Sequence, residues 1–145
     1  MRCLLLVDDN TDCVEEVTRQ IVDSQLDVTE LVVAHSLGEA LRLIKTTCPD
    51  VILLDLDLGD SKALATLEAV RDQTDAVVIV LNDNADESLG VEALKAGADD
   101  FLVKSEVCEA CLRASIVNST VRRNLRLTSK RMKSNLNSLC EMAGV

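Results

Sequence analysis

Aromatic residues are almost absent from this 145-residue sequence, which has one phenylalanine, Phe101, and neither tyrosine nor tryptophan. The core must therefore be aliphatic, and no row of aromatic side chains is available for stacking on nucleic-acid bases. No apolar run approaches the ~20 residues that a membrane-spanning helix requires. The opening run CLLLV ends at two aspartates, which does not fit a signal peptide. We expect a globular cytoplasmic domain with no membrane contact.

Histidine is equally scarce, because His35 is the only one in the sequence. In a chain without an export signal we expect reduced thiols and no disulfide framework for the six cysteines, at positions 3, 13, 48, 108, 111 and 140. Cys108 and Cys111 have CxxC spacing, but neither a second cysteine pair nor a histidine accompanies them. This pattern favours an ordinary pair on a helix over a zinc site.

Charge divides the chain into two parts. Residues 1–109 hold 24 of the 25 acidic side chains, whereas residues 110–145 hold 7 of the 15 basic ones. Neither glycine nor proline occurs from Glu106 to Ala143, which favours a long helix, about 50 Å if it is continuous from Glu106 to Glu141. We therefore predict a globular domain over residues 1–118 and a basic helical extension over residues 119–145.

Five apolar, strand-like runs recur along the first part of the chain, at residues 3–7, 30–34, 51–54, 76–81 and 101–103. Apolar residues at helical spacing, such as Leu37, Leu41 and Ile44, lie between the runs. Strands that alternate with helices predict an α/β fold, in which a parallel sheet is covered by helices on both faces.

Polar residues follow four of these runs directly, and they supply the candidate site: Asp8 and Asp9, Asp55 and Asp57, Asn82, and Lys104. Ligands bind at the carboxyl ends of the strands in such sheets, so these residues should share one edge. Two carboxylates about 4 Å apart repel by roughly 4 kcal/mol at an effective dielectric constant near 20. A divalent cation would cancel this repulsion, and an all-carboxylate site favours a hard ion such as Mg²⁺.

A metal ion and the Lys104 ammonium beside one aspartate create an environment suited to phosphoryl transfer, in which aspartate can form an acyl phosphate. The segments that carry this interpretation resemble the receiver domain of two-component response regulators: LLLVDDN at 4–10, VILLDLDLG at 51–59, VVIVLN at 77–82 and ALKAGADDFLVKS at 93–105. They occur in that family's order and spacing. The resemblance implies a flavodoxin-like, doubly wound five-stranded sheet in the order 2-1-3-4-5, followed here by an extended C-terminal helix.

The resemblance also implies a role for each site residue. Asp55 would be the phosphoacceptor, and Lys104 would contact the phosphoryl group. Asp8 and Asp9, with Asp55 and the backbone carbonyl of Asp57, would hold Mg²⁺ or Mn²⁺. Asn82 and Phe101 would form the conformational switch. The phosphoryl donor would be a phosphohistidine on a sensor histidine kinase or a histidine phosphotransfer protein.

Three positions depart from the family pattern. Asn82 stands where the family usually has threonine or serine, although an amide can still donate a hydrogen bond. Ser105 replaces a proline that follows a cis peptide bond, and since cis costs roughly 2.5–4 kcal/mol before serine, we expect a trans Lys104–Ser105 bond. Ser105 also suits the N-cap of the last helix. Gly59 replaces another proline, and this should loosen the loop after Asp55.

Two other functions are compatible with these residues. The departures at Asn82 and Ser105 leave open a degenerate receiver, which binds partners without phosphorylation. The Asp55-Leu56-Asp57 sequence has the DxD spacing of haloacid-dehalogenase-like phosphatases, in which aspartate is a nucleophile. In those enzymes, however, the nucleophile follows the first strand, whereas here it follows the third.

The last helix begins with apolar residues that should pack on the sheet, namely Val107, Cys111, Leu112 and Ile116. Beyond them a broken heptad stripe and several basic residues allow three interpretations. The helix forms a homodimer or leads to an output domain, or it is a solvated tail, or it contacts nucleic acid. The last is disfavoured because no DNA-binding motif accompanies the charge.

Overall fold

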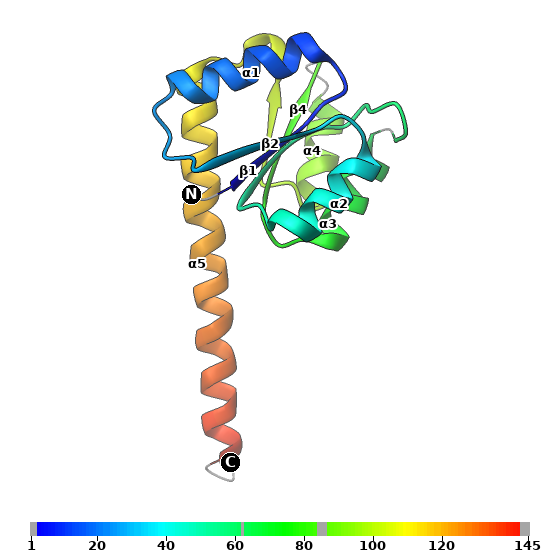
Figure 1. Cartoon of the computed structure of the whole chain (residues 1–145). Coiled ribbons are helices and arrows are strands. Elements are labelled where there is room, and N and C mark those ends of the chain that lie inside the picture. The colour runs from blue at the N-terminus through cyan, green and yellow to red at the C-terminus, as the bar shows by residue number, and fades with distance from the viewer. Residues whose placement is uncertain (1–2, 62, 84–86, 143–145) are drawn as a thin grey trace.

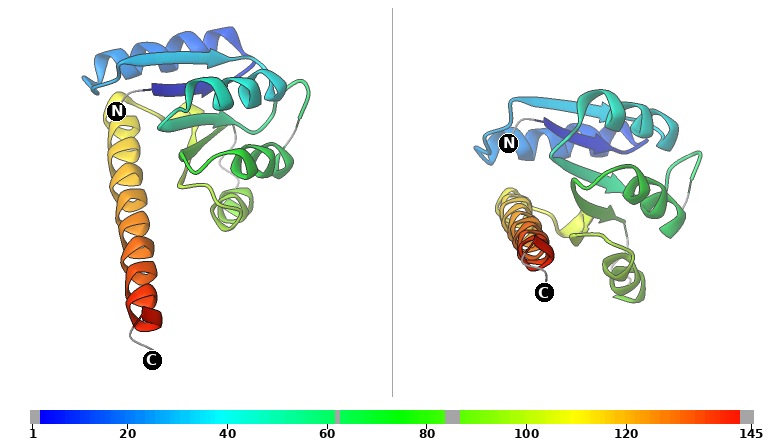
Figure 2. Two further views of the ribbon diagram at one scale, coloured as in Figure 1. Left: turned by 60° about the horizontal axis from the view of Figure 1, so that its bottom comes forward. Right: turned by 90° about the horizontal axis from the view of Figure 1, so that it is seen from below.

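Five parallel strands form one sheet in the order β2-β1-β3-β4-β5, with helices on both faces (Figures 1 and 2). The strands are β1 Cys3–Val7, β2 Glu30–Ala34, β3 Val51–Asp55, β4 Val77–Asn82 and β5 Asp100–Val103. This computed structural model describes residues 3–61, 63–83 and 87–142, with the backbone alone for residues 87 and 126–142. The predicted α/β class and strand order are confirmed.

The helices are α1 Thr11–Asp23, α2 Leu37–Thr47, α3 Leu64–Gln73, α4 Glu87–Lys95 and α5 Glu109–Met142. One aliphatic cluster joins alternate sheet residues such as Leu5 and Ile52 to α2, α3 and α4. A second cluster on the opposite face joins residues such as Leu6 and Leu53 to α1 and α5. Because β1, β3 and β4 are buried on both faces, their sequences are continuous apolar runs.

The last helix begins later than the sequence suggests. Residues Lys104–Glu106 form a single 3₁₀ turn, and α5 begins at Glu109, so Ser105 does not cap it and that prediction was wrong. Leu112 and Ile116 are buried against the sheet, as expected, but Cys111 is exposed. A helix turns about 100° per residue, so the position before a buried leucine need not face the core.

The 34 residues of α5 correspond to about 51 Å, and the helix runs well beyond the sheet (Figure 1). Its contacts with the sheet domain include that of Arg123, whose Nε donates to the Asp75 carbonyl oxygen over 2.7 Å. The neighbouring Arg122 donates to the Asp99 carbonyl oxygen over 3.1 Å. The expected heptad stripe and the remaining basic side chains, from residue 126 on, lie outside the described side chains.

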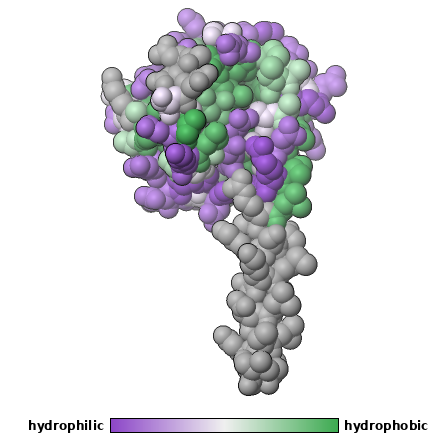
Figure 3. Space-filling view, turned by 180° about the vertical axis from the view of Figure 1, so that it is seen from behind, coloured by the Kyte–Doolittle hydropathy of each residue, from purple (hydrophilic) through white to green (hydrophobic). Residues whose placement is uncertain are grey.

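Figure 3 shows the molecule from behind the view of Figure 1. On this face hydrophobic residues are exposed next to hydrophilic ones. Large exposed apolar side chains include Val91 and Leu94 on α4 and Val117, Val121 and Leu125 on α5. Within the described ranges, none of the helices combines the length and apolarity needed to cross a membrane.

Candidate functional site

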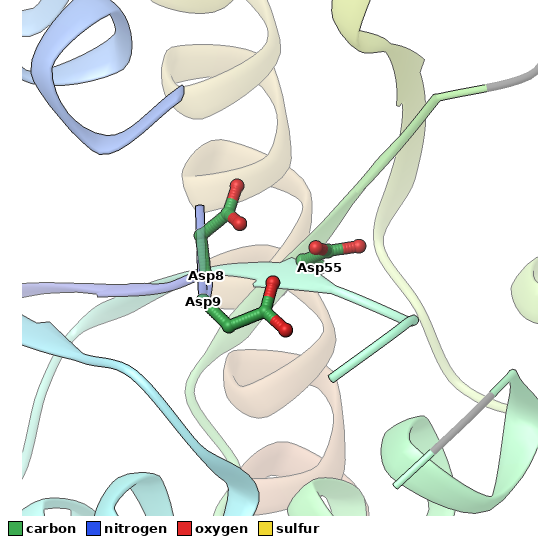
Figure 4. A group of neighbouring side chains, drawn as sticks. All are labelled: Asp8, Asp9 and Asp55. Atoms are coloured by element: carbon green, nitrogen blue, oxygen red, sulfur yellow. The ribbon is translucent and has the colours of Figure 1, made fainter. Parts of the chain in front are cut away.

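The site lies at the carboxyl edge of the sheet, where β1 and β3 end next to each other. Val7 pairs with Leu54 in the parallel register, so Asp8 and Asp55 leave neighbouring strands at the same level. One carboxylate oxygen from each of Asp8, Asp9 and Asp55 lies within 4.8 Å of the others (Figure 4). The three acids that the sequence analysis selected therefore share one edge.

Two of these acids are buried and one is exposed. Asp8 and Asp55 are 1% and 4% exposed, whereas Asp9 faces solvent. Buried carboxylates destabilise a fold unless a counter-charge or hydrogen bonds compensate them. The counter-charge is Lys104, whose Nζ lies 2.8 Å from Asp8 Oδ2 and 3.2 Å from Asp55 Oδ2. Its third acidic neighbour, Asp83, is at 3.7 Å and largely exposed.

The second oxygen of each buried acid accepts a hydrogen bond from the backbone two residues further along. Asn10 N–H donates to Asp8 Oδ1 over 2.9 Å, and Asp57 N–H donates to Asp55 Oδ1 over 3.1 Å. Aspartate favours such local turns, which fix its side-chain orientation. In both residues one oxygen is thus held by the main chain, and the other faces Lys104.

These surroundings shift the acid–base properties of the site. Burial raises the pKa of Asp55 to about 6, although the N–H of Asp57 and the charge of Lys104 act in the opposite direction. Burial alone would lower the pKa of Lys104, but the hydrogen bond and charge of Asp8, together with Asp55, raise it overall. At neutral pH the site therefore holds an ammonium group against carboxylates, with Asp55 mainly ionised.

The remaining predicted residues surround this cluster. Asn82 is the buried last residue of β4. Its neighbour Leu81 pairs with Asp55 in the register, so Asn82 lies on the strand next to Asp55. The side chain of Asp57 is exposed, and its backbone N–H orients Asp55. The Lys104–Ser105 peptide bond is trans, as expected, because none of the described peptide bonds is cis.

Phe101 lies on β5. It is partly buried against the aliphatic cluster that joins the sheet to α2, α3 and α4. A Cβ atom placed on Gly90 of α4 would be 3.2 Å from Phe101 Cδ1, so the glycine leaves room for the ring. The Phe101 ring therefore lies against α4 at Gly90. A side chain at position 90 would push the ring away. Sequence reasoning did not select Gly90.

Two further residues that the sequence did not suggest hold the loop after Asp55. Thr66 is fully buried and donates from Oγ1 to the Leu56 carbonyl oxygen over 2.9 Å. Asp60 accepts from the N–H groups of Leu37 and Gly38, over 2.9 and 3.1 Å, at the start of α2. These backbone hydrogen bonds lower the pKa of Asp60. The loop is thus attached to two helices.

Comparison with known proteins agrees with this geometry. The family model of the response regulator receiver domain matches residues 4–115. The acid tolerance regulatory protein ActR of Sinorhizobium medicae is 33% identical over 116 residues, which cover 79% of this chain and 58% of ActR. The transcriptional regulatory protein KdpE of Mycobacterium tuberculosis is 37% identical over 94 residues, 63% of this chain and 42% of KdpE. The matched region is thus little more than half of ActR and less than half of KdpE.

Solved structures show the same fold. The receiver domain protein of Clostridium thermocellum has a TM-score of 0.75 at 24% identity, with 86% of this chain and 98% of that chain covered. The CheY-like receiver domain protein of Methanospirillum hungatei has a TM-score of 0.73, also at 24% identity, with 87% and 98% covered. The match over residues 4–115 and the strand order β2-β1-β3-β4-β5 lead to one conclusion: the chain belongs to the response regulator receiver domain family.

Proposed function

We propose that this receiver domain acts in the cytoplasm and accepts a phosphoryl group on Asp55 from a phosphohistidine of a sensor histidine kinase or a histidine phosphotransfer protein. The observation that carries the proposal is the pair of contacts from Lys104 Nζ, 2.8 Å to Asp8 and 3.2 Å to Asp55. An ammonium group held beside a carboxylate nucleophile can also pair with the negative oxygens of an incoming phosphoryl group.

The transfer requires a nucleophilic oxygen and a leaving imidazole. An Asp55 oxygen forms a bond to phosphorus, the phosphorus–nitrogen bond to the donor histidine breaks, and the bonding electrons stay on the imidazole. Asp57 N–H keeps the carboxylate oriented, and Lys104 balances negative charge on the transferred group. A pKa of about 6 leaves Asp55 mainly in its ionised, nucleophilic form at neutral pH.

The donor set fits Mg²⁺ or Mn²⁺, because it consists of carboxylates with oxygens within 4.8 Å of one another. Asp8, Asp9 and Asp55, with the Asp57 backbone carbonyl, would hold the ion. When bound, it would neutralise charge on the phosphoryl oxygens. Asp9 is the exposed member of the group, so its carboxylate is accessible to a cation from solvent.

The proposed switch consists of Asn82 and Phe101. Asn82 is buried at the end of β4, so its amide can donate a hydrogen bond to a phosphoryl group on the neighbouring strand. Phe101 lies on the next strand, with its ring on α4 at Gly90. A movement of Asn82 toward Asp55 would alter the space available to the Phe101 ring, and thereby the α4 surface.

The output would be supplied by a partner or by residues outside the receiver domain. We propose a division into a receiver domain, residues 1–118, and a helical extension, residues 119–145, with the first turns of the extension attached through Arg122 and Arg123. ActR and KdpE are regulatory proteins about twice as long as their matched regions. By analogy, α5 would lead to an output region or to a homodimer contact.

A degenerate receiver is the second candidate, because Asn82 and Ser105 replace residues on which the family's switch depends. A phosphatase is less well supported, since Asp55 follows the third strand of the sheet.

The three functions give different results with one small-molecule phosphodonor. The full chain is incubated with acetyl phosphate and Mg²⁺, and its intact mass is measured, with Asp55→Ala as the test variant and Asp57→Ala as the matched control. A receiver gains one phosphoryl group, and only Asp55→Ala loses the adduct. Rapid hydrolysis of varied phosphomonoesters would indicate a phosphatase, and neither adduct nor hydrolysis would indicate the degenerate receiver.

A further inference from the structure

Cys108 and Cys111 lie at the junction between β5 and α5, where Figure 1 shows the start of α5 beside α1. Cys108 directly precedes the helix, and its carbonyl oxygen accepts from Leu112 N–H over 2.9 Å, as expected of an N-cap residue. The two sulfur atoms are only 2.9 Å apart. A disulfide bond is about 2.05 Å long, so the sulfurs need to approach by less than about 1 Å.

The environment of the pair makes the two thiols unequal. Hydrogen bonds from the Cys111 thiol and from Cys111 N–H, the latter 3.3 Å from Cys108 Sγ, lower the pKa of Cys108. The same interaction with Cys108 raises the pKa of Cys111. A more acidic first thiol beside a less acidic second one is the arrangement in which CxxC pairs exchange with disulfides, because the thiolate is the attacking species.

The two cysteines are more exposed to solvent than Cys3 and Cys13. Both sulfurs belong to exposed residues, and a surface depression of about 430 Å³ that includes Arg19, Val107 and Cys108 opens beside them. By contrast, burial raises the pKa of Cys3 and Cys13.

A metal site is the main alternative use of two neighbouring cysteines. Structural zinc sites have four ligands. Among the described residues, however, the one group of three or more candidate ligands is Asp8, Asp9 and Asp55. Within this part of the chain, the pair therefore lacks the further ligands that such a site requires.

We propose that Cys108 and Cys111 form a redox-active dithiol that closes to an intramolecular disulfide. The Cys108 thiolate attacks a low-molecular-weight disulfide, forms a mixed disulfide and releases one thiolate. Cys111 then loses its proton and attacks Cys108 Sγ, which releases the second thiolate. Two electrons pass from the cysteines to the oxidant, which leaves as two thiols, and both cysteine protons are given up. The disulfide would begin four residues after Lys104, and it would form independently of phosphorylation.

Trypsin should release both cysteines in one peptide, residues 105–113, because it cuts after Lys104 and Arg113. The full chain is equilibrated in buffers with set ratios of reduced and oxidised glutathione, alkylated with N-ethylmaleimide and digested. We expect this peptide to change from two alkyl groups to none in one two-electron transition, losing two hydrogens. Cys108→Ser and Cys111→Ser should abolish the transition, whereas Cys48→Ser, at another exposed cysteine, should leave it unchanged.

The rate of alkylation tests the inequality of the thiols. In Cys111→Ser, Cys108 should react faster with iodoacetamide than Cys48 in the same protein, and circular dichroism verifies that the variants are folded. Two alkyl groups on the peptide at every glutathione ratio would overturn the proposal. So would thiols that react only after a chelator is added, since that result indicates a bound metal.

Discussion

Lys104 Nζ lies 3.2 Å from Asp55 Oδ2, although 49 residues separate them in the sequence. The same ammonium group lies 2.8 Å from Asp8 Oδ2. Two buried carboxylates thus share one counter-charge, which reduces the energetic cost of ending buried strands in aspartates. The arrangement also keeps a charged cluster at the edge where a phosphoryl group would enter.

Removal of the shared counter-charge should destabilise the protein. Lys104→Met leaves Asp8 and Asp55 buried without their ammonium partner, and we expect the free energy of unfolding at pH 7 to fall by roughly 3 kcal/mol. Urea denaturation measures this loss. Lys95→Met, at an exposed lysine of α4, is the control. An equal effect of both substitutions would show that Lys104 does not compensate the acids.

Asp55 should make stability depend on pH in a definite direction. Its pKa rises from the ordinary 3.8 to about 6 on folding, so the folded protein binds this proton more tightly than the unfolded chain. Protonated Asp55 therefore stabilises the folded state. This contribution is complete below about pH 3.8 and is lost as the pH rises through about 6. In EDTA, the stability of Asp55→Asn relative to wild type should therefore increase from pH 4 to pH 7, by on the order of 2–3 kcal/mol.

Unfolding curves at several pH values give this difference directly. Asp57→Asn, at the exposed acid two residues away, is the control. A difference that stays constant or shrinks as the pH rises would contradict the pKa assigned to Asp55.

Mg²⁺ should stabilise the folded chain through the acidic cluster. A ligand that binds only the folded state adds about 1.4 kcal/mol at ten times its dissociation constant. The thermal midpoint should therefore rise with Mg²⁺ concentration. Asp9→Asn should remove most of the rise with little effect in EDTA, because Asp9 is exposed. Asp12→Asn, at the exposed acid in the first turn of α1, should respond to Mg²⁺ like the wild type.

Phe101 offers an unusually direct probe of the proposed switch. It is the only phenylalanine in a chain without tyrosine or tryptophan, so the proton NMR signals of its ring overlap with few others. Gly90→Ala would place a Cβ 3.2 Å from Phe101 Cδ1 and should shift these signals. Gly59→Ala, where nothing lies within 4 Å, should not. Phosphorylation should also move the ring signals, and unchanged signals in the phosphorylated protein would remove Phe101 from the switch.

Much of the fold could be predicted from the sequence because the central strands are buried on both faces. Their apolar runs end where polar residues begin, so 3–7 matches β1 and 51–54 matches β3 to within one residue, and the polar residues at the ends of these runs mark the site edge. In a parallel sheet all strands end at the same edge. Asp8 and Asp55 stand at the ends of two such apolar runs, so they could be predicted to lie together although they are distant in sequence.

The parts that were missed depend on contacts between residues far apart in the chain. Thr66 and Asp60 bind backbone groups that no local pattern identifies. The exposure of Cys111 follows from where α5 begins, and that position is set by the turn after Lys104. Arg123 had no acidic neighbour in sequence, yet it contacts Asp75 across 48 residues. Long-range hydrogen bonds and turn geometry, not periodicity, decided these cases.

The central claim is that Asp55 is the residue that receives phosphate. Hydride reduction of the phosphorylated chain converts an aspartyl phosphate to homoserine, and tandem mass spectrometry of the tryptic peptide 46–62 locates it. After treatment with acetyl phosphate and Mg²⁺, we expect homoserine at position 55 and not at Asp50, Asp57 or Asp60, which share the peptide. Homoserine at another aspartate, or none in the folded, Mg²⁺-treated protein, would contradict the account.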